Sequence, residues 1–211
     1  MRLLTNVLDF LSPAGCTSCG ATVTGDQLGL LCGDCRGTLP VTMKRITGPP
    51  SIVEMVAMGP YESALGGMVR AAKYGPHLGA ADALGRRLGE ALCGWVDVDA
   101  VVAVPIPRVR RWRRGFCQGE RLARAVAAET GLSAEPLLGR ASGPPQVGQR
   151  AAARRALPVS AFLVSDAVIP ERVLLVDDVR TTGATLHAAA RALKRRGARH
   201  IWAATVCFQG S

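Results

Sequence analysis

A series of residues between positions 173 and 186 has the types and the spacing to bind a phosphate and a sugar. A short apolar run is followed by two adjacent aspartates, a turn rich in threonine and glycine, and the start of an alanine-rich segment typical of a helix. The free N–H groups and partial positive charge at a helix start favour an anion. Glycine lets the anion approach the backbone closely, and threonine hydroxyls add hydrogen-bond donors. We therefore expect a phosphate on Thr181, Thr182, Gly183, Ala184 and Thr185.

The two aspartates before this turn, Asp177 and Asp178, are poorly suited to holding the phosphate itself, because like charges repel. Their oxygens suit the hydroxyl groups of an attached ribose, or the water shell of a metal ion. The alternative is a Rossmann-like strand and turn in which the acidic pair is incidental. Glycine-rich turns are common, but this ordered series of residues is not, so it favours a binding site.

Near the amino terminus, four cysteines form two Cys-x-x-Cys pairs, Cys16 with Cys19 and Cys32 with Cys35. This spacing predicts a closed tetrahedral zinc site, and metal binding would organise a segment too short to fold alone. The alternative is two disulfides, which the intracellular character of the remaining chain disfavours. Because four protein ligands leave no open position, we expect Zn²⁺ to serve structure or partner recognition rather than catalysis.

Hydrophobic periodicity predicts an α/β fold. We expect strands at residues 52–58, 100–104, 135–138, 173–176 and 201–207, and helices at residues 61–73, 78–92, 118–130 and 184–196. Residues 139–160 show no regular pattern and are expected to be irregular. Continuous apolar strands that alternate with helices favour a parallel sheet flanked by helices. Ligands bind such sheets at the carboxyl ends of the strands, where the acidic pair falls.

Lysine and arginine exceed aspartate and glutamate by 26 to 16, which gives a formal net charge of +10. This excess indicates a polyanionic ligand, either a diphosphate sugar, a nucleic acid, or both in succession. The alternative is a set of solvated basic faces without a ligand. No apolar run approaches the roughly 20 residues needed to span a bilayer. The first 11 residues are expected to be a short amphipathic helix rather than a signal peptide, and the protein to be cytoplasmic.

Two loops concentrate arginines. The first holds Arg110, Arg111, Arg113 and Arg114 around Trp112, and the second holds Arg150, Arg154 and Arg155. Guanidinium groups suit a diphosphate, and arginines beside an aromatic side chain also suit single-stranded nucleic acid. The second loop is longer than most connections, and loops of this length are usually functional or disordered. Solvated loops without a ligand remain the alternative for both.

The series 173–186 resembles the phosphoribosyl diphosphate (PRPP) loop of the type I phosphoribosyltransferases. The resemblance implies that Asp177 and Asp178 bind the ribose 2′ and 3′ hydroxyls and that residues 181–185 bind the 5′-phosphate. It also implies that the first arginine loop binds diphosphate together with Mg²⁺. The second arginine loop would be the mobile lid over the reacting centre.

Motifs along nearly the whole chain resemble the ComF family. They are the four-cysteine module, Ala-Ala-Lys73-Tyr-Gly, Val104-Pro-Ile-Pro107, Arg114-Gly-Phe-Cys-Gln118, Gln146 with Arg154-Arg155 downstream, and the PRPP loop. The family is associated with natural competence and the handling of single-stranded DNA, and its members are described as phosphoribosyltransferases of unknown acceptor. Cys117 and Leu157 stand where the family pattern has asparagine, so two amides that could contact a ligand are missing.

The resemblance implies a division into residues 1–50, with the zinc module and a linker, and residues 51–211, a phosphoribosyltransferase-like domain. Within it, residues 52–92 would contribute to a hood that recognises the acceptor. Two functions follow as hypotheses. The first is a phosphoribosyltransferase (a glycosyltransferase) that transfers a pentosyl group from PRPP to an unknown acceptor, in DNA uptake or nucleotide metabolism. The second is a non-catalytic competence protein that binds single-stranded DNA or a protein of the competence machinery and uses the PRPP loop to sense a ligand.

Overall fold

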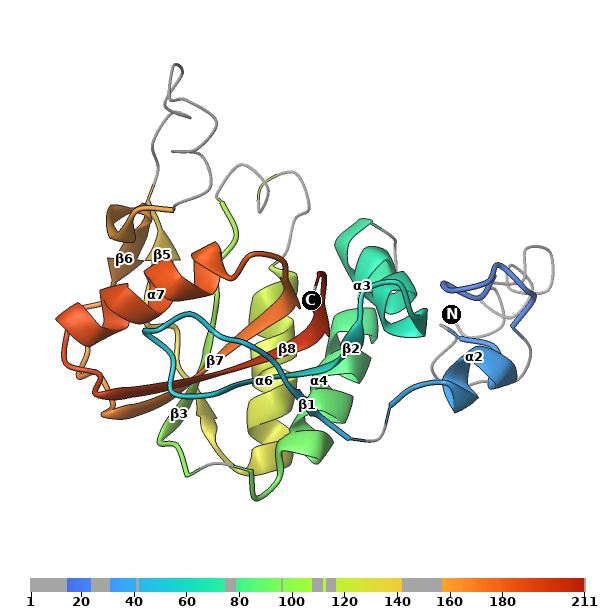
Figure 1. Cartoon of the computed structure of the whole chain (residues 1–211), viewed down its shortest axis with the longest axis horizontal. Helices are drawn as coiled ribbons and strands as arrows, with labels where there is room; N and C mark the ends of the chain where they lie inside the picture. Colours follow the sequence, from blue (N-terminus) through green and yellow to red (C-terminus); the bar gives the residue numbers. More distant parts are fainter. Residues whose placement is uncertain are drawn as a thin grey trace, which may run out of the picture.

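A computed structural model describes residues 15–23, 31–40, 42–74, 79–95, 97–107, 112, 117–141 and 157–210. Its centre is a six-stranded sheet with helices on both faces (Figure 1). In spatial order the strands are β1 (Lys44–Arg45), β2 (Met55–Pro60), β8 (His200–Phe208), β7 (Arg172–Arg180), β3 (Ala100–Ala103) and β4 (Ser133–Ala134). Only the edge pair β1 and β2 is antiparallel among these described strands. The predicted α/β fold with a mostly parallel sheet is therefore confirmed.

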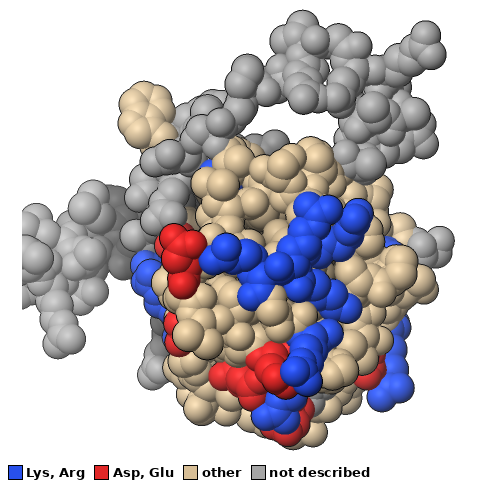
Figure 2. Space-filling view, turned by 90° about the vertical axis from the view of Figure 1, so that its left-hand side faces the viewer, with Lys and Arg blue, Asp and Glu red and all other residues tan. Residues whose placement is uncertain are grey.

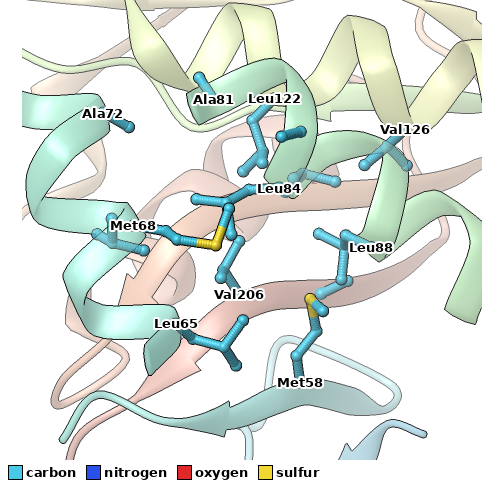
Figure 3. Packing of buried hydrophobic residues seen from close by; sticks show 14 of the residues in the cluster. Met58, Leu65, Met68, Ala72, Ala81, Leu84, Leu88, Leu122, Val126 and Val206 are labelled. Carbon is cyan, nitrogen blue, oxygen red and sulfur yellow. The ribbon is translucent and has the colours of Figure 1, made fainter. Parts of the chain in front are cut away.

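Three helices cover one face of the sheet, namely α3 (Ala64–Tyr74), α4 (Gly79–Leu92) and α6 (Gln118–Thr130). Their apolar side chains meet those of the sheet in one core, in which Leu65, Met68, Leu84 and Leu122 converge on Val206 (Figure 3). The helix α7 (Ala184–Arg195) covers the opposite face, where Leu186 and Leu193 pack against the other side of the strands. Burial on both faces explains why the strands are continuous apolar runs.

The helices α4 and α6 approach each other closely because α4 carries glycine at the contact. A Cβ atom on Gly85 would lie 2.6 Å from the Cβ of Ala125 and 2.6 Å from the carbonyl oxygen of Leu122. Arg121 of α6 also donates to the carboxylate of Asp82 on α4, with Nε 3.0 Å from Oδ1. The first residue of α6, Gln118, lies beside Asp178 of β7.

Several predicted elements have shifted bounds, one predicted strand does not form, and part of a segment predicted to be irregular is ordered. Strand β2 begins at Met55 rather than at residue 52, because the preceding residues form a turn closed by the N–H of Ile52 donating to the oxygen of Pro49. The strand predicted at 135–138 does not form. Pro136, which lacks an N–H donor, instead separates β4 from β5 (Leu138–Arg140). Strand β5 pairs with β6 (Phe162–Val164) in a small antiparallel sheet, so residues 139–160 are not wholly irregular.

In the amino-terminal part, the short helix α2 (Gly33–Gly37) follows the third cysteine. The amphipathic helix predicted for residues 1–11 lies outside the described residues, and the division of the chain at residue 50 stays a prediction. In the described parts of the chain, no helix combines the length and the apolarity needed to cross a bilayer.

Candidate functional site

A pocket of about 470 Å³ opens at the carboxyl ends of β3, β7 and β8. Both aspartates of the acidic pair and two threonines of the following turn, Thr181 and Thr185, line it. The structure therefore brings the acidic pair and part of the predicted phosphate site to one cavity. This is the edge at which parallel α/β sheets bind ligands.

Strand β7 extends beyond its apolar part and carries both aspartates to the sheet edge. Successive side chains of a strand point to opposite faces. Leu174 and Val176 accordingly lie in the core beneath α3, α4 and α6, whereas Val173 and Leu175 lie in the core beneath α7. By the same alternation, Asp178 belongs to the face covered by α3 and α6.

The turn after β7 leads directly into α7. Gly183 has φ 78° and ψ −1°, a left-handed conformation that glycine adopts without strain, and it caps the amino end of the helix. The N–H of Ala184 donates to Oγ1 of Thr182 at 3.3 Å. Residues 181–185 thus span the turn and the first two residues of a twelve-residue helix, the arrangement that favours an anion. Phosphate binding at these five residues stays a prediction.

Asp178 is held at both carboxylate oxygens. Lys73, from the last turn of α3, places Nζ 2.8 Å from Oδ1. Gln118, the first residue of α6, donates from Nε2 to Oδ2 at 3.3 Å. Both side chains line the pocket, although neither was among the site residues predicted from the sequence. The sequence did contain a signal for them, because Lys73 and Gln118 both belong to motifs that resemble the ComF family.

Asp177 has a different environment. Its Oδ1 accepts a hydrogen bond from the backbone N–H of Asp178 at 2.9 Å. Burial, followed by the negative charge of Asp178, raises the pKa of Asp177 to about 8. The carboxyl of Asp177 therefore ionises less readily than that of an ordinary aspartate.

A second cation that was not among the predicted site residues, Arg140 at the end of β5, also lines the pocket. Its guanidinium carbon lies 4.6 Å from the ring centroid of Phe162, the first residue of β6. Because β5 and β6 pair with each other, the small antiparallel sheet positions this arginine at the pocket. Its positive charge also acts on the carboxyl of Asp177.

The arginines of the two loops, Arg110, Arg111, Arg113, Arg114, Arg150, Arg154 and Arg155, lie outside the described residues. Their proposed contacts stay predictions. Trp112, between the first four, is 85% exposed. Of the two positions that depart from the family pattern, Cys117 is buried at the start of α6, and Leu157 packs against the core beneath α7.

The four cysteines converge as the spacing predicts. The sulfur atoms of Cys16, Cys19, Cys32 and Cys35 all lie within 4.8 Å of one another. Tetrahedral zinc with Zn–S bonds of about 2.3 Å needs sulfur atoms about 3.8 Å apart, and those of Cys19 and Cys32 are 3.7 Å apart. All seven cysteines are free thiols, so the alternative of two disulfides is not what the structure contains. The donor set fits a metal ion, and four sulfur ligands favour zinc.

The first cysteine pair packs directly on α3. A Cβ atom on Gly67 would lie 2.5 Å from the carbonyl oxygen of Thr17 and 2.9 Å from the Cα of Ser18. Cys16 and Leu31 are buried in the same core as α3 and α4. The cysteine module is therefore in contact with the helix that carries Lys73.

Basic side chains also gather far from the pocket. The face in Figure 2 includes the carboxyl end of α7, at the edge of the sheet opposite the acidic pair. Exposed cations in this part of the chain are Arg191, Lys194, Arg195, Arg196 and Arg199. Arg196 pairs with Asp166, and Arg199 with Glu171. The positive charge of the chain is thus not confined to the two arginine loops.

Comparison with known proteins gives a family match in the part of the chain that contains the acidic pair and the turn after it. Residues 119–211 match the phosphoribosyl transferase domain family. The matched region runs from α6 through β7 and the 181–185 turn to the end of the sheet. It therefore includes both aspartates and all five residues of the predicted phosphate site.

The matched relatives carry names that refer to DNA utilization or to competence. The chain is 26% identical over 200 residues to the DNA utilization protein YhgH of Escherichia coli strain K12, which covers 91% of this chain and 83% of that protein. It is 27% identical over 200 residues to the protein of the same name in Salmonella typhimurium, with the same coverage. Over 100 residues it is 34% identical to the competence protein ComFC of Streptococcus pneumoniae, covering 47% of this chain and 44% of that protein.

Proposed function

Because the chain belongs to the ComF family, we propose that its pocket binds PRPP or a related ribose 5-phosphate ligand and transfers the phosphoribosyl group to an acceptor. The observation that carries this proposal is the shared cavity of the acidic pair and the turn at the start of α7. The turn suits the 5′-phosphate, and the carboxyl groups beside it suit the ribose hydroxyls.

In the proposed reaction, the bond from ribose C1 to the diphosphate breaks and a bond from C1 to a nucleophilic atom of the acceptor forms. The transition state has oxocarbenium character, so catalysis consists mainly of positioning and of stabilising charge. Residues 181–185 and the acidic pair would hold the ribose 5-phosphate. PRPP would enter as its magnesium complex, in which Mg²⁺ offsets part of the diphosphate charge. The arginines of the two loops would offset the remaining negative charge of the diphosphate.

A calorimetric titration with magnesium PRPP, combined with an assay of diphosphate release in the presence of candidate nucleobases, tests this proposal. The double variant Asp177→Asn, Asp178→Asn is expected to lose diphosphate release and to weaken PRPP binding at least tenfold, because it removes the carboxylates that hold the ribose. The matched control is Asp166→Asn, a fully exposed aspartate remote from the pocket. Equal PRPP affinity in the double variant and the control would contradict the proposal.

A second candidate is a binding protein without catalysis, which engages single-stranded DNA and uses the pocket to sense a ligand. The net charge of +10 favours it, as do the DNA utilization and competence names of the relatives. Such a protein should bind single-stranded DNA with an affinity that falls as salt rises. Changing Arg110, Arg111 and Arg113 to alanine should weaken that binding more than changing Arg191, Lys194 and Arg195. PRPP binding without diphosphate release from any acceptor would favour this second candidate.

We further propose that the four cysteines hold a structural Zn²⁺. Four thiolates leave the ion no position for a reacting water. Zinc-bound and unpaired cysteines are typical of a reducing compartment, so the proposed site of action is the cytoplasm.

A further inference from the structure

Gln118 is the most deeply buried polar side chain that lines the pocket. It is only 3% exposed, although it is the first residue of α6. A glutamine in this position costs free energy unless its amide is used, because a buried amide without hydrogen bonds is unfavourable. Both ends of the buried amide therefore need hydrogen-bond partners.

The donor end of the amide is occupied and the acceptor end is not. Nε2 donates to Oδ2 of Asp178, and this contact fixes the orientation, because the reverse would set the amide oxygen against a carboxylate. Oε1 is buried and has no hydrogen-bond partner in the described part of the chain. An unsatisfied buried acceptor costs about 1–3 kcal/mol, so native proteins rarely keep one without a use.

The position of Gln118 limits which ligand groups can donate a hydrogen bond to its amide oxygen. Gln118 lines the pocket and its amide is bonded to Asp178, so a ligand hydroxyl bound to Asp178 would lie beside that amide. An amide oxygen accepts hydrogen bonds but does not donate them, so its partner must carry O–H or N–H. A ribose carries two adjacent hydroxyl donors beside its phosphate, whereas an ionised phosphate offers only acceptors.

We propose that Gln118 is a specificity residue that reads the ribose of the ligand, with its amide oxygen accepting a hydrogen bond from a ribose hydroxyl. Gln118 and the acidic pair then form one recognition surface for the sugar, with Lys73 holding Asp178 from the other side. This inference rests on the proposed function, because it takes a ribose 5-phosphate as the ligand.

The test compares ribose 5-phosphate with inorganic phosphate by calorimetric titration of the full chain. Gln118→Met keeps the length of the side chain but removes the amide. It should weaken ribose 5-phosphate binding about tenfold, the value of one good hydrogen bond, and leave phosphate binding unchanged. Gln118→Leu serves if the methionine variant melts well below the wild type. An equal loss for both ligands, or no loss for either, would overturn the inference.

Two further arms make the outcome specific. Repeating the comparison in the Asp178→Asn background separates direct contact from an effect through Asp178. A further loss of ribose 5-phosphate affinity there supports contact, and no further loss refutes it. The same variant is then titrated with 2-deoxyribose 5-phosphate. If Gln118→Met no longer weakens binding of this ligand, the 2-hydroxyl is the donor to Gln118; if it still weakens binding, the 3-hydroxyl is the donor. Failure of the wild type to prefer ribose 5-phosphate over phosphate would instead count against the proposed function itself.

Discussion

Asp177 and Asp178 are neighbours in the sequence, yet their carboxyl groups meet different surroundings. Asp178 is paired with Lys73 and accepts a hydrogen bond from Gln118, whereas burial and the adjacent charge raise the pKa of Asp177. The motif alone predicted the pair and the turn after it, because both are local. It could not predict the asymmetry, since Lys73 and Gln118 reach the site from two helices much earlier in the chain.

The raised pKa of Asp177 predicts how stability depends on pH. An unfolded aspartate has a pKa near 3.8 and the folded one is raised to about 8, so between these values the folded state binds the extra proton. Stability therefore falls as pH rises through this window and levels off above it. Asp177→Asn should remove this contribution. Urea unfolding at pH 5, 7 and 9 should show that the free energy of unfolding of the variant increases relative to that of the wild type as pH rises. A difference between the two proteins that stays constant with pH would refute the raised pKa of Asp177.

At the scale of elements, predictions succeeded where the signal was local. The helix predicted at 118–130 has those bounds, and Gly131 ends it with φ 72°. The pairing of β5 with β6 was missed because these strands are far apart in sequence, with a proline interrupting the apolar run before β5. Such non-local pairing leaves no periodic trace in either segment. The position of Arg140 at the pocket was not predicted either, because it depends on the pairing of β5 with β6.

The close contact between α4 and α6 predicts the effect of a single added methyl group. Gly85→Ala should lower the free energy of unfolding by about 1–3 kcal/mol, because the new Cβ would overlap Ala125 and the backbone of Leu122. Gly79→Ala, at the start of the same helix, is the matched control because a Cβ there meets no atom within 4 Å. Denaturant unfolding of both variants checks this. Equal stability would show that the helices separate without cost.

For the molecule as a whole, α3 connects the cysteine module with the pocket. Gly67 contacts the first cysteine pair, and Lys73 reaches Asp178 from the last turn of the same helix. The cysteine spacing predicted the cluster, but no pattern in the sequence indicated where the module would dock. The docking surface depends on small residues of α3, such as Gly67, whose role becomes visible only once both segments are folded.

Loss of the metal should therefore affect more than the module. Structural zinc sites contribute on the order of 10 kcal/mol in small modules. We expect Cys19→Ser to lower the melting temperature and to weaken ribose 5-phosphate binding, because α3 loses a packing partner. The control is Cys93→Ser, an exposed cysteine outside the cluster. Metal content by atomic emission, read alongside thermal melting, checks the prediction. A metal-free variant with unchanged melting and binding would show that the module is independent of α3.

The most direct measurement of the central claim is a crystal structure of the chain soaked with ribose 5-phosphate. We expect the phosphate to lie against the backbone of residues 181–185 and the sugar hydroxyls to face Asp177 and Asp178, within the pocket at the carboxyl ends of β3, β7 and β8. A ligand bound elsewhere while this turn stays vacant would contradict the account, whatever the four cysteines bind.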